Sequence, residues 1–259
     1  MRETTVKIRV IVAAHKAYRM PKDSMYLPLH VGKAGKNLEL GFQGDNTGDN
    51  ISAKNPSFCE LTGIFWAWKN LDADYVGLAH YRRHFRGRPG RNKWNCILTE
   101  KDAGLLLQGN DVLLPKRRNY YIETVYSQYV HAHPAEGLDL ALELASAGGE
   151  NYARAAESLK KRSWTHIFNM FIMKREIFDR YCAWLFPILF EVERRIDTDT
   201  YSDYDKRLFG FLSERLLDVF LEANGIHYRE IPVMFMEKQN WLKKGSAFLK
   251  RKFTANKGD

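Results

Sequence analysis

Short apolar segments rich in β-branched residues alternate along this chain with longer segments of helical periodicity. The strand-like runs are Val6–Ala14, Met25–Val31, Tyr75–Ala79, Asp111–Pro115, His166–Lys174 and His227–Met236. Strands that alternate with helices at this spacing are typical of a parallel sheet covered by helices. The sequence therefore predicts an α/β fold with a mostly parallel central sheet. The helical periodicity of residues 122–162 predicts a helical middle section packed around that sheet.

Length and composition fit a single folded domain. The chain has 259 residues, of which 45% are hydrophobic and 13% aromatic, and these values are typical of globular proteins. The first apolar run is too short for a signal peptide or a membrane span. The three cysteines, Cys59, Cys96 and Cys182, have no paired spacing for metal binding or redox chemistry. We therefore expect a reduced, cytoplasmic protein with one domain over residues 1–237.

The remaining residues, 238–259, carry most of the positive charge. The formal net charge is +9, and this tail has seven Lys or Arg against one Asp. The body is therefore only mildly basic, which argues against nucleic acid as a partner. In a helical projection Trp241, Phe248 and Phe253 lie on one side of the tail, opposite most of its cations. The pattern predicts a basic amphipathic tail that binds the anionic inner face of the plasma membrane. A helix packed on the body is the alternative.

The segment His80–Arg83 directly follows the predicted strand Tyr75–Ala79. In open α/β sheets, ligands bind outside the carboxyl ends of the strands. Arginine stays charged at any working pH and presents paired planar donors, so Arg82 and Arg83 suit a diphosphate or a carboxylate. His15 leaves the first strand at the same edge. The segment therefore marks either a ligand site or a solvated basic turn.

A polar loop rich in Gly, Asn and Asp, residues 44–55, precedes a predicted helix at Pro56–Leu71. The loop has neither a GxGxxG pattern nor a P-loop lysine, so taken alone it is a turn-rich connection. It enters a helix whose N-terminus can bind an anion, and that helix carries Glu60 near the same end. We expect the loop to border the ligand site.

Two Asp-x-Asp pairs are present, Asp72/Asp74 and Asp197/Asp199. A metal-dependent nucleotide-sugar enzyme usually places such a pair just after a strand, because Mg²⁺ or Mn²⁺ binds carboxylate oxygens beside the phosphates. Here the first pair precedes its strand and the second follows a helix. We therefore expect arginine rather than a metal to neutralise phosphate and predict no metal-binding residue, with Mg²⁺ or Mn²⁺ as the open alternative.

Candidate general bases lie near a predicted helix at residues 206–225. Arg207 and Glu214 share one face of this helix through their spacing. Asp205 and Glu214 flank the apolar helix and are the best carboxylates for taking a proton, with His131 third. The alternative is an ordinary salt bridge between one of these acids and Arg207 or Arg215.

Several blocks of the sequence resemble a bacterial family regarded as glycosyltransferases. They are GDNTGDNISAKNPSFCELTGIFWAWKN, YVGLAHYRRHF, DVLLP, YSQYVHAHP, FNMFIMKREIFDRYCAWLFPILFEVE and RLFGFLSERLL, and the likeness covers residues 6–236. The family occurs in gene clusters for capsule, exopolysaccharide and lipopolysaccharide synthesis and was long filed as a domain of unknown function. The resemblance implies a GT-A-like nucleotide-sugar-binding fold and sugar transfer to a surface glycan. Galactofuranose transfer from its UDP donor is the activity most readily associated with it.

The resemblance also implies roles for individual residues. On the donor side it implies His15, Asp45, Asn50, Asn55, Glu60, Trp66, His80, Tyr81, Arg82 and Arg83. On the acceptor side it implies Tyr126, Tyr129, His131, Asn169, Arg207 and Glu214. The segment at residues 80–83 occupies the place where many GT-A enzymes carry a metal-binding Asp-x-Asp motif. This departure leaves metal dependence open.

Residues and resemblance together predict an inverting glycosyltransferase that uses a UDP-sugar and a glycan or lipid-linked glycan acceptor. In this hypothesis Arg82 and Arg83 stabilise the departing diphosphate, while Glu214, Asp205 or His131 takes the acceptor proton. Two alternatives stay open. One is a metal-dependent UDP-hexopyranose glycosyltransferase, and the other is a non-enzymatic protein that binds nucleic acid or glycan through its cations and aromatic residues.

Overall fold

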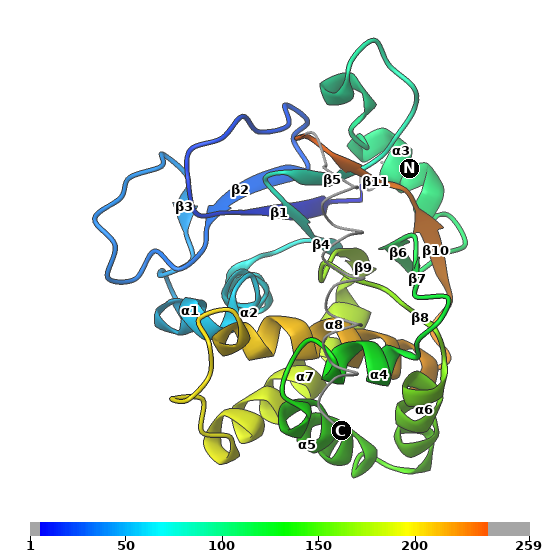
Figure 1. Cartoon of the computed structure of the whole chain (residues 1–259). Coiled ribbons are helices and arrows are strands. Elements are labelled where there is room, and N and C mark those ends of the chain that lie inside the picture. Colours follow the sequence, from blue (N-terminus) through cyan, green and yellow to red (C-terminus); the bar gives the residue numbers. More distant parts are fainter. Residues whose placement is uncertain (1–5, 238–259) are drawn as a thin grey trace.

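A twisted sheet lies across the middle of the molecule (Figure 1). The structure is a computed structural model of the chain, and it describes residues 6–237. The sheet has the order β10-β6-β9-β4-β1-β2-β3, and β5 and β11 extend it beside β4. Its strands are β1 Ile8–Ala14, β2 Tyr26–His30, β3 Gln43–Gly44, β4 Tyr75–His80, β5 Arg83–Phe85, β6 Val112–Pro115, β9 Phe171–Lys174, β10 Tyr228–Ile231 and β11 Val233–Phe235. A separate small ribbon pairs β7 Arg118–Asn119 with β8 Trp164–Thr165.

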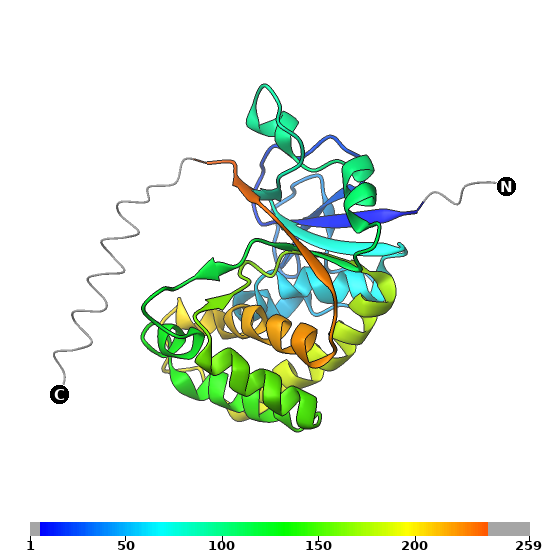
Figure 2. The same cartoon turned by 90° about the vertical axis from the view of Figure 1, so that its right-hand side faces the viewer.

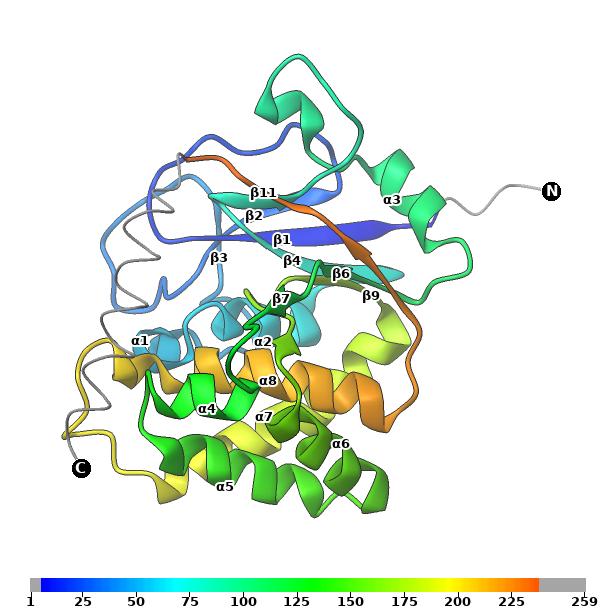
Figure 3. The same cartoon turned by 45° about the vertical axis from the view of Figure 1, so that its right-hand side comes forward.

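Helices cover mainly one face of this sheet. Figure 1 shows α1, α2, α7 and α8 beneath it, with α4, α5 and α6 around them, as the helical middle section predicted. These helices are α1 Asn55–Phe58, α2 Leu61–Asn70, α4 Val125–Val130, α5 Ala135–Ser146, α6 Glu150–Lys161, α7 Arg175–Arg195 and α8 Leu208–Ala223. On the other face lie α3 Glu100–Leu107 and the 3-10 turn η2 Lys93–Cys96 (Figure 3). Between residues 6 and 237, no helix is both long and apolar enough to cross a membrane.

Strand direction brings several chain segments to one edge of the sheet. β1 pairs in parallel with β2 and β4, β2 pairs in parallel with β3, and β10 pairs in parallel with β6. β9 is antiparallel to both β4 and β6, so β4 and β6 run in the same direction. The mostly parallel sheet predicted from the sequence is therefore confirmed. The carboxyl ends of β1, β2, β4 and β6 all lie at the same edge.

The sheet separates two hydrophobic cores because alternate side chains of each strand point to opposite faces. In β1, Ile11 and Ala13 belong to the larger core under the helices, whereas Val10 and Val12 belong to the smaller core on the other side. All four are buried. Burial of a Val or Ile side chain contributes about 1.5–3 kcal/mol. The continuous apolar run of β1 is thus explained by burial on both faces.

Three of the departures from the predicted elements matter most for the site. The predicted helix at Pro56–Leu71 is broken at Cys59, which has φ of 52°, so α1 and α2 are separate helices. The predicted strand at His166–Lys174 begins only at Phe171, because Phe168 and Asn169 have φ of 81° and 53°. The segment after β4, for which no strand was predicted, turns back as strand β5.

Candidate functional site

The edge where β1 and β4 end carries the predicted basic segment. His80 closes β4 and pairs with Arg83, the first residue of β5, so Tyr81 and Arg82 form the tight turn between two antiparallel strands. The Tyr81 ring is buried, and its hydroxyl lies 3.4 Å from the Nε2 of His15. The strand therefore delivers His80, Tyr81, Arg82 and Arg83 to the carboxyl edge of the sheet, where the sequence located the site.

Cations gather around His15 at this edge. Burial lowers the pKa of His15, and the nearby charges of Arg82, Lys16, Lys36 and Arg207 lower it further. Lys16 and Arg82 both lie over the Tyr81 ring, at 5.7 Å and 4.9 Å from its centroid. Arg82 also forms a 3.2 Å ion pair with Glu237. This part of the edge is electropositive and accessible, which suits an anionic ligand.

Arg83 is placed differently from Arg82. Its guanidinium lies 4.6 Å from the ring centroid of Phe168 and 5.9 Å from that of Phe235. Within residues 6–237 no carboxylate is close enough to form an ion pair with it. Burial lowers the pKa of Arg83, although Glu60 and Glu214 oppose that effect. A half-buried guanidinium held on aromatic rings without an ionic partner is a prepared position for an anion.

The turn at Phe168 and Asn169 joins the groups around Arg83. The Nε2–H of His80 donates to the Phe168 carbonyl oxygen at 2.6 Å, and the Phe168 N–H donates to the Oε1 of Glu214 at 2.8 Å. The Asn169 Nδ2 donates to the Oε1 of Glu60 at 2.7 Å. Two consecutive residues with positive φ are unusual outside glycine, most of all for an aromatic residue. This strained turn holds one histidine and two carboxylates in fixed positions.

Glu60 owes its position to the helix break at Cys59. It stands immediately before α2 and is half-buried, and only its Oε1 accepts a described hydrogen bond. The donor, Asn169, is buried and fully used, because its Nδ2 also donates to the Gly210 carbonyl at 3.0 Å and its Oδ1 accepts from Ser213. Asn169, implied by the resemblance as an acceptor ligand, is instead a residue that orients Glu60.

Glu214 is more enclosed than Glu60. Its Oε1 accepts from the Phe168 N–H and its Oε2 accepts from Arg215 at 2.7 Å, and only 17% of its side chain is exposed. Burial raises the pKa of Glu214, although Arg215 and the Phe168 N–H oppose the shift. Burial lowers the pKa of His80, although Glu60 and the Phe168 carbonyl oppose the shift. The site therefore combines a histidine, two carboxylates and the Arg83 guanidinium.

The loop residues predicted to bind the nucleotide-sugar make hydrogen bonds within the loop and to the segments beside it. Asp45 is fully buried and accepts from Gly32 N at 2.8 Å, Lys33 N at 3.0 Å and Thr62 Oγ1 at 2.6 Å, and also from Ser52 Oγ. The other three residues make internal bonds as well. Trp66 Nε1 donates to Thr47, Asn50 bonds Gly48 and Ser52, and Asn55 bonds Cys59 and Thr62. These contacts give the four residues a structural role.

Four further predicted residues are engaged elsewhere. Asp205 accepts from His133 at 2.9 Å and from Ser202 at 2.6 Å. Burial raises the pKa of Asp205, but these two bonds outweigh burial and hold the pKa below its usual value. His131 bonds Glu123, and the Tyr126 hydroxyl donates to Asp139. Tyr129 is completely buried, so it cannot face an acceptor in this structure. By contrast, Arg207 lies near the cluster, with its Nε 3.3 Å from the Cys59 sulfur.

Phe168 and its partner Phe235 were not among the predicted site residues. Phe168 was expected inside a strand, where its ring would have been one more core residue. The only available signal was the Asn that follows it, since Asn tolerates positive φ better than most residues. Phe235 belongs to β11, which adds to the sheet through β5.

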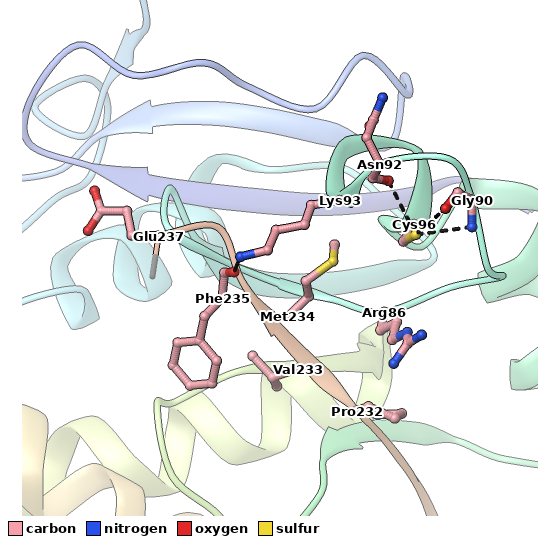
Figure 4. A pocket seen from close by; sticks show the side chains of 10 residues that line it. All are labelled: Arg86, Gly90, Asn92, Lys93, Cys96, Pro232, Val233, Met234, Phe235 and Glu237. Carbon is pink, nitrogen blue, oxygen red and sulfur yellow. Dashed lines mark hydrogen bonds between the residues drawn. The ribbon is translucent and has the colours of Figure 1, made fainter. Parts of the chain in front are cut away.

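A groove of about 530 Å³ adjoins this cluster along β11 (Figure 4). Its apolar lining includes Val233, Met234 and Phe235, and Lys93 crosses it to donate to the Phe235 carbonyl at 2.7 Å. Phe235 and Glu237 connect the groove to Arg83 and Arg82. The groove is therefore continuous with the basic edge of the sheet.

The described residues offer no evident metal centre. No group of three or more His, Cys, Asp or Glu side chains between residues 6 and 237 is placed to share a metal ion. Asp72 pairs with Lys7 at the start of β1, at the opposite edge of the sheet from His80. Asp197 only accepts from the backbone of Asp199 in an exposed turn. We therefore assign no residue of the cluster to a metal.

Comparison with known proteins agrees with the fold just described. A solved structure described as the apo form of a bifunctional glycosyltransferase, WbbM, superposes with a TM-score of 0.81 at 30% sequence identity. The match covers 90% of this chain and 46% of that chain, so the present chain spans about half of its length. The comparison with curated proteins gives no match. A family model described as a domain of unknown function, DUF4422, matches residues 9–225, most of the chain, and the chain therefore belongs to that family.

Proposed function

We propose that this chain transfers a sugar from a nucleotide-sugar donor to a glycan acceptor at the carboxyl edge of its sheet. The observation that carries the proposal is that Arg83, which has no ionic partner among the described residues, and the half-buried carboxylate of Glu60 belong to the same cluster. A leaving diphosphate requires the cation, and an attacking hydroxyl requires the carboxylate. Similarity to a bifunctional glycosyltransferase supports the same reaction class.

In the proposed reaction the cations bind the donor diphosphate. Arg83 would bind phosphate oxygens with its paired donors, and Arg82, Lys16 and Lys36 would add positive charge from the edge. The bond between the anomeric carbon and the phosphate oxygen breaks, and the nucleoside diphosphate leaves with the electron pair. Fixed cations stabilise the charge that grows on this group without having to reorganise.

The acceptor hydroxyl attacks the anomeric carbon from the opposite side and inverts its configuration. We assign the general base to Glu60, because one of its oxygens has no described partner while Asn169 fixes the other. Glu214, the residue favoured from the sequence, has both oxygens engaged and a raised pKa, so we assign it to positioning of the Phe168 turn. The acceptor proton passes to the Glu60 carboxylate as the new bond forms.

The finer identity of the substrates rests on the sequence resemblance. It supports a GT-A-type enzyme with UDP-galactofuranose as donor and a capsule, exopolysaccharide or lipopolysaccharide glycan as acceptor. The basic tail at residues 238–259 supports peripheral binding to the inner membrane face, where lipid-linked acceptors are found. This tail lies outside the described residues.

Isothermal calorimetry with UDP, GDP, dTDP and CMP, each with and without Mn²⁺, tests the proposed donor class. We expect UDP to bind and the Arg83→Gln variant to bind it more weakly. A metal-dependent enzyme would bind UDP only with Mn²⁺. Binding of single-stranded RNA with no response to any nucleotide would instead support the nucleic-acid alternative.

A further inference from the structure

An apolar turn preceded by three cations projects at the same edge of the sheet, outside the cluster just described. It follows β6, whose carboxyl end lies at that edge, and comprises residues 116–122. Tyr121 is 86% exposed and Ile122 is 61% exposed, the two largest exposures among the large hydrophobic residues of the described chain. Figure 2 shows β7 and the following loop, in green, at the periphery of the molecule.

The turn is held rigidly by its ends. The Ile122 N–H donates to the Tyr120 carbonyl at 2.7 Å, and Tyr121 between them has φ of 60°, a tight and strained three-residue turn. Tyr120 N–H donates to the Ser163 carbonyl and Val125 N–H donates to the Arg162 carbonyl, both at 2.8 Å. The fold thus fixes two apolar side chains in water, which is unfavourable unless another surface covers them.

Three consecutive cations, Lys116, Arg117 and Arg118, precede the apolar tip, and all three are exposed. Arg117 already has partners, because it forms an ion pair with Glu230 at 2.6 Å and its guanidinium lies 4.2 Å from the Trp164 ring centroid. Lys116 and Arg118 have no carboxylate within ion-pair distance in the described chain. Two uncompensated cations behind an apolar tip match the headgroup and acyl layers of an anionic bilayer.

We propose that residues 116–122 form a contact with an anionic phospholipid surface, in which Tyr121 and Ile122 enter the interface and Lys116 and Arg118 bind lipid phosphates. The contact is separate from the C-terminal tail. Tyr120, at the base of the turn, lies near Arg215 and Glu214 of the cluster. If the proposed function holds, such a contact would turn the site toward acceptors carried by lipid.

Hydrogen–deuterium exchange of the full chain, read at peptides that cover residues 116–124, tests this contact without any donor or acceptor. We expect vesicles of phosphatidylglycerol and phosphatidylcholine to slow exchange in this segment, and vesicles of phosphatidylcholine alone to have no effect. The local readout separates this contact from any binding by the tail, and sugar transfer plays no part in the measurement.

Variants sharpen the test. The double variant Tyr121→Ser/Ile122→Ser and the double variant Lys116→Gln/Arg118→Gln should each lose the protection and weaken anionic-vesicle binding by about tenfold. Leu105→Ser, which changes a 48% exposed side chain on α3, is the matched control and should change nothing. Unchanged exchange with anionic vesicles would overturn the proposal. Equal protection by neutral vesicles, or protection by single-stranded RNA alone, would do so as well.

Discussion

We expect donor binding to depend most on Arg83. It is half-buried on Phe168 and Phe235 and has no carboxylate partner among residues 6–237. We expect Arg83→Gln to weaken UDP binding by about 10- to 100-fold, since a hydrogen bond to a charged group contributes about 1.5–3 kcal/mol. Calorimetry measures this change. Arg88→Gln is the control, because the Arg88 side chain is 69% exposed and pairs with Asp102 of α3, so its loss should leave UDP binding unchanged.

Substitution of Glu60 is expected to change the rate of sugar transfer rather than donor binding. Glu60→Gln keeps an oxygen that can accept from Asn169 but cannot take a proton. We expect kcat for sugar transfer to fall by about 10²- to 10⁴-fold, the usual contribution of a general base, while UDP affinity changes little. Single-turnover kinetics with a saturating donor measures the rate. A larger loss of kcat in Glu214→Gln than in Glu60→Gln would show that Glu214, and not Glu60, is the general base.

At the scale of elements, the loop before α2 depends on Asp45. Its buried carboxylate accepts from two backbone N–H groups and two hydroxyls. In Asp45→Asn an NH₂ group replaces one of the two accepting oxygens and faces groups that donate. We expect the free energy of unfolding to fall by about 1–3 kcal/mol. Urea denaturation measures the loss. Asp49→Asn, an exposed position in the same loop, should leave stability unchanged.

Sequence patterns predicted the elements of the fold better than their interruptions. The apolar run of β1 and the spacing of α8 follow from burial, which is a local pattern. The breaks at Cys59 and at Phe168 were missed, because tertiary contacts hold those residues at positive φ against their own preference. Each break positions a carboxylate or its partner. The position of His80–Arg83 at the carboxyl edge of the sheet was therefore predictable from the sequence. The hydrogen bonds of the loop residues and of the candidate bases were not, because they depend on tertiary contacts.

The whole molecule contains buried histidines that link stability to pH. Both ring nitrogens of His84 lack a good hydrogen bond inside the smaller core. Burial lowers the pKa of His84 to about 4, the nearby His80 adds to the shift, and the Tyr81 backbone opposes it. Because the pKa of His84 is lower in the folded chain, the unfolded chain takes up the proton at a higher pH than the folded chain does. The contribution of His84 to the free energy of unfolding is therefore fully present above the unfolded pKa of about 6.5 and is lost as the pH falls toward 4.

We expect this group to remove about 2 kcal/mol from the free energy of unfolding between pH 7 and pH 5. Urea denaturation at both pH values measures the loss. His84→Met, which fills the site with an apolar side chain that cannot be protonated, should reduce the pH dependence by that amount. His227→Gln, at an exposed position, should retain the full dependence. An identical pH dependence in wild type and His84→Met would show that other groups carry the effect.

A donor turnover screen tests whether glycosyl transfer takes place at the cluster of Arg83 and Glu60. UDP release would be measured across UDP-sugars, including the furanose form of UDP-galactose, for the wild type, Arg83→Gln and Glu60→Gln. We expect turnover of at least one UDP-sugar by the wild type, weaker donor binding in Arg83→Gln and slow turnover at normal donor affinity in Glu60→Gln. Turnover equal to wild type in both variants would show that these two residues do not carry the transfer.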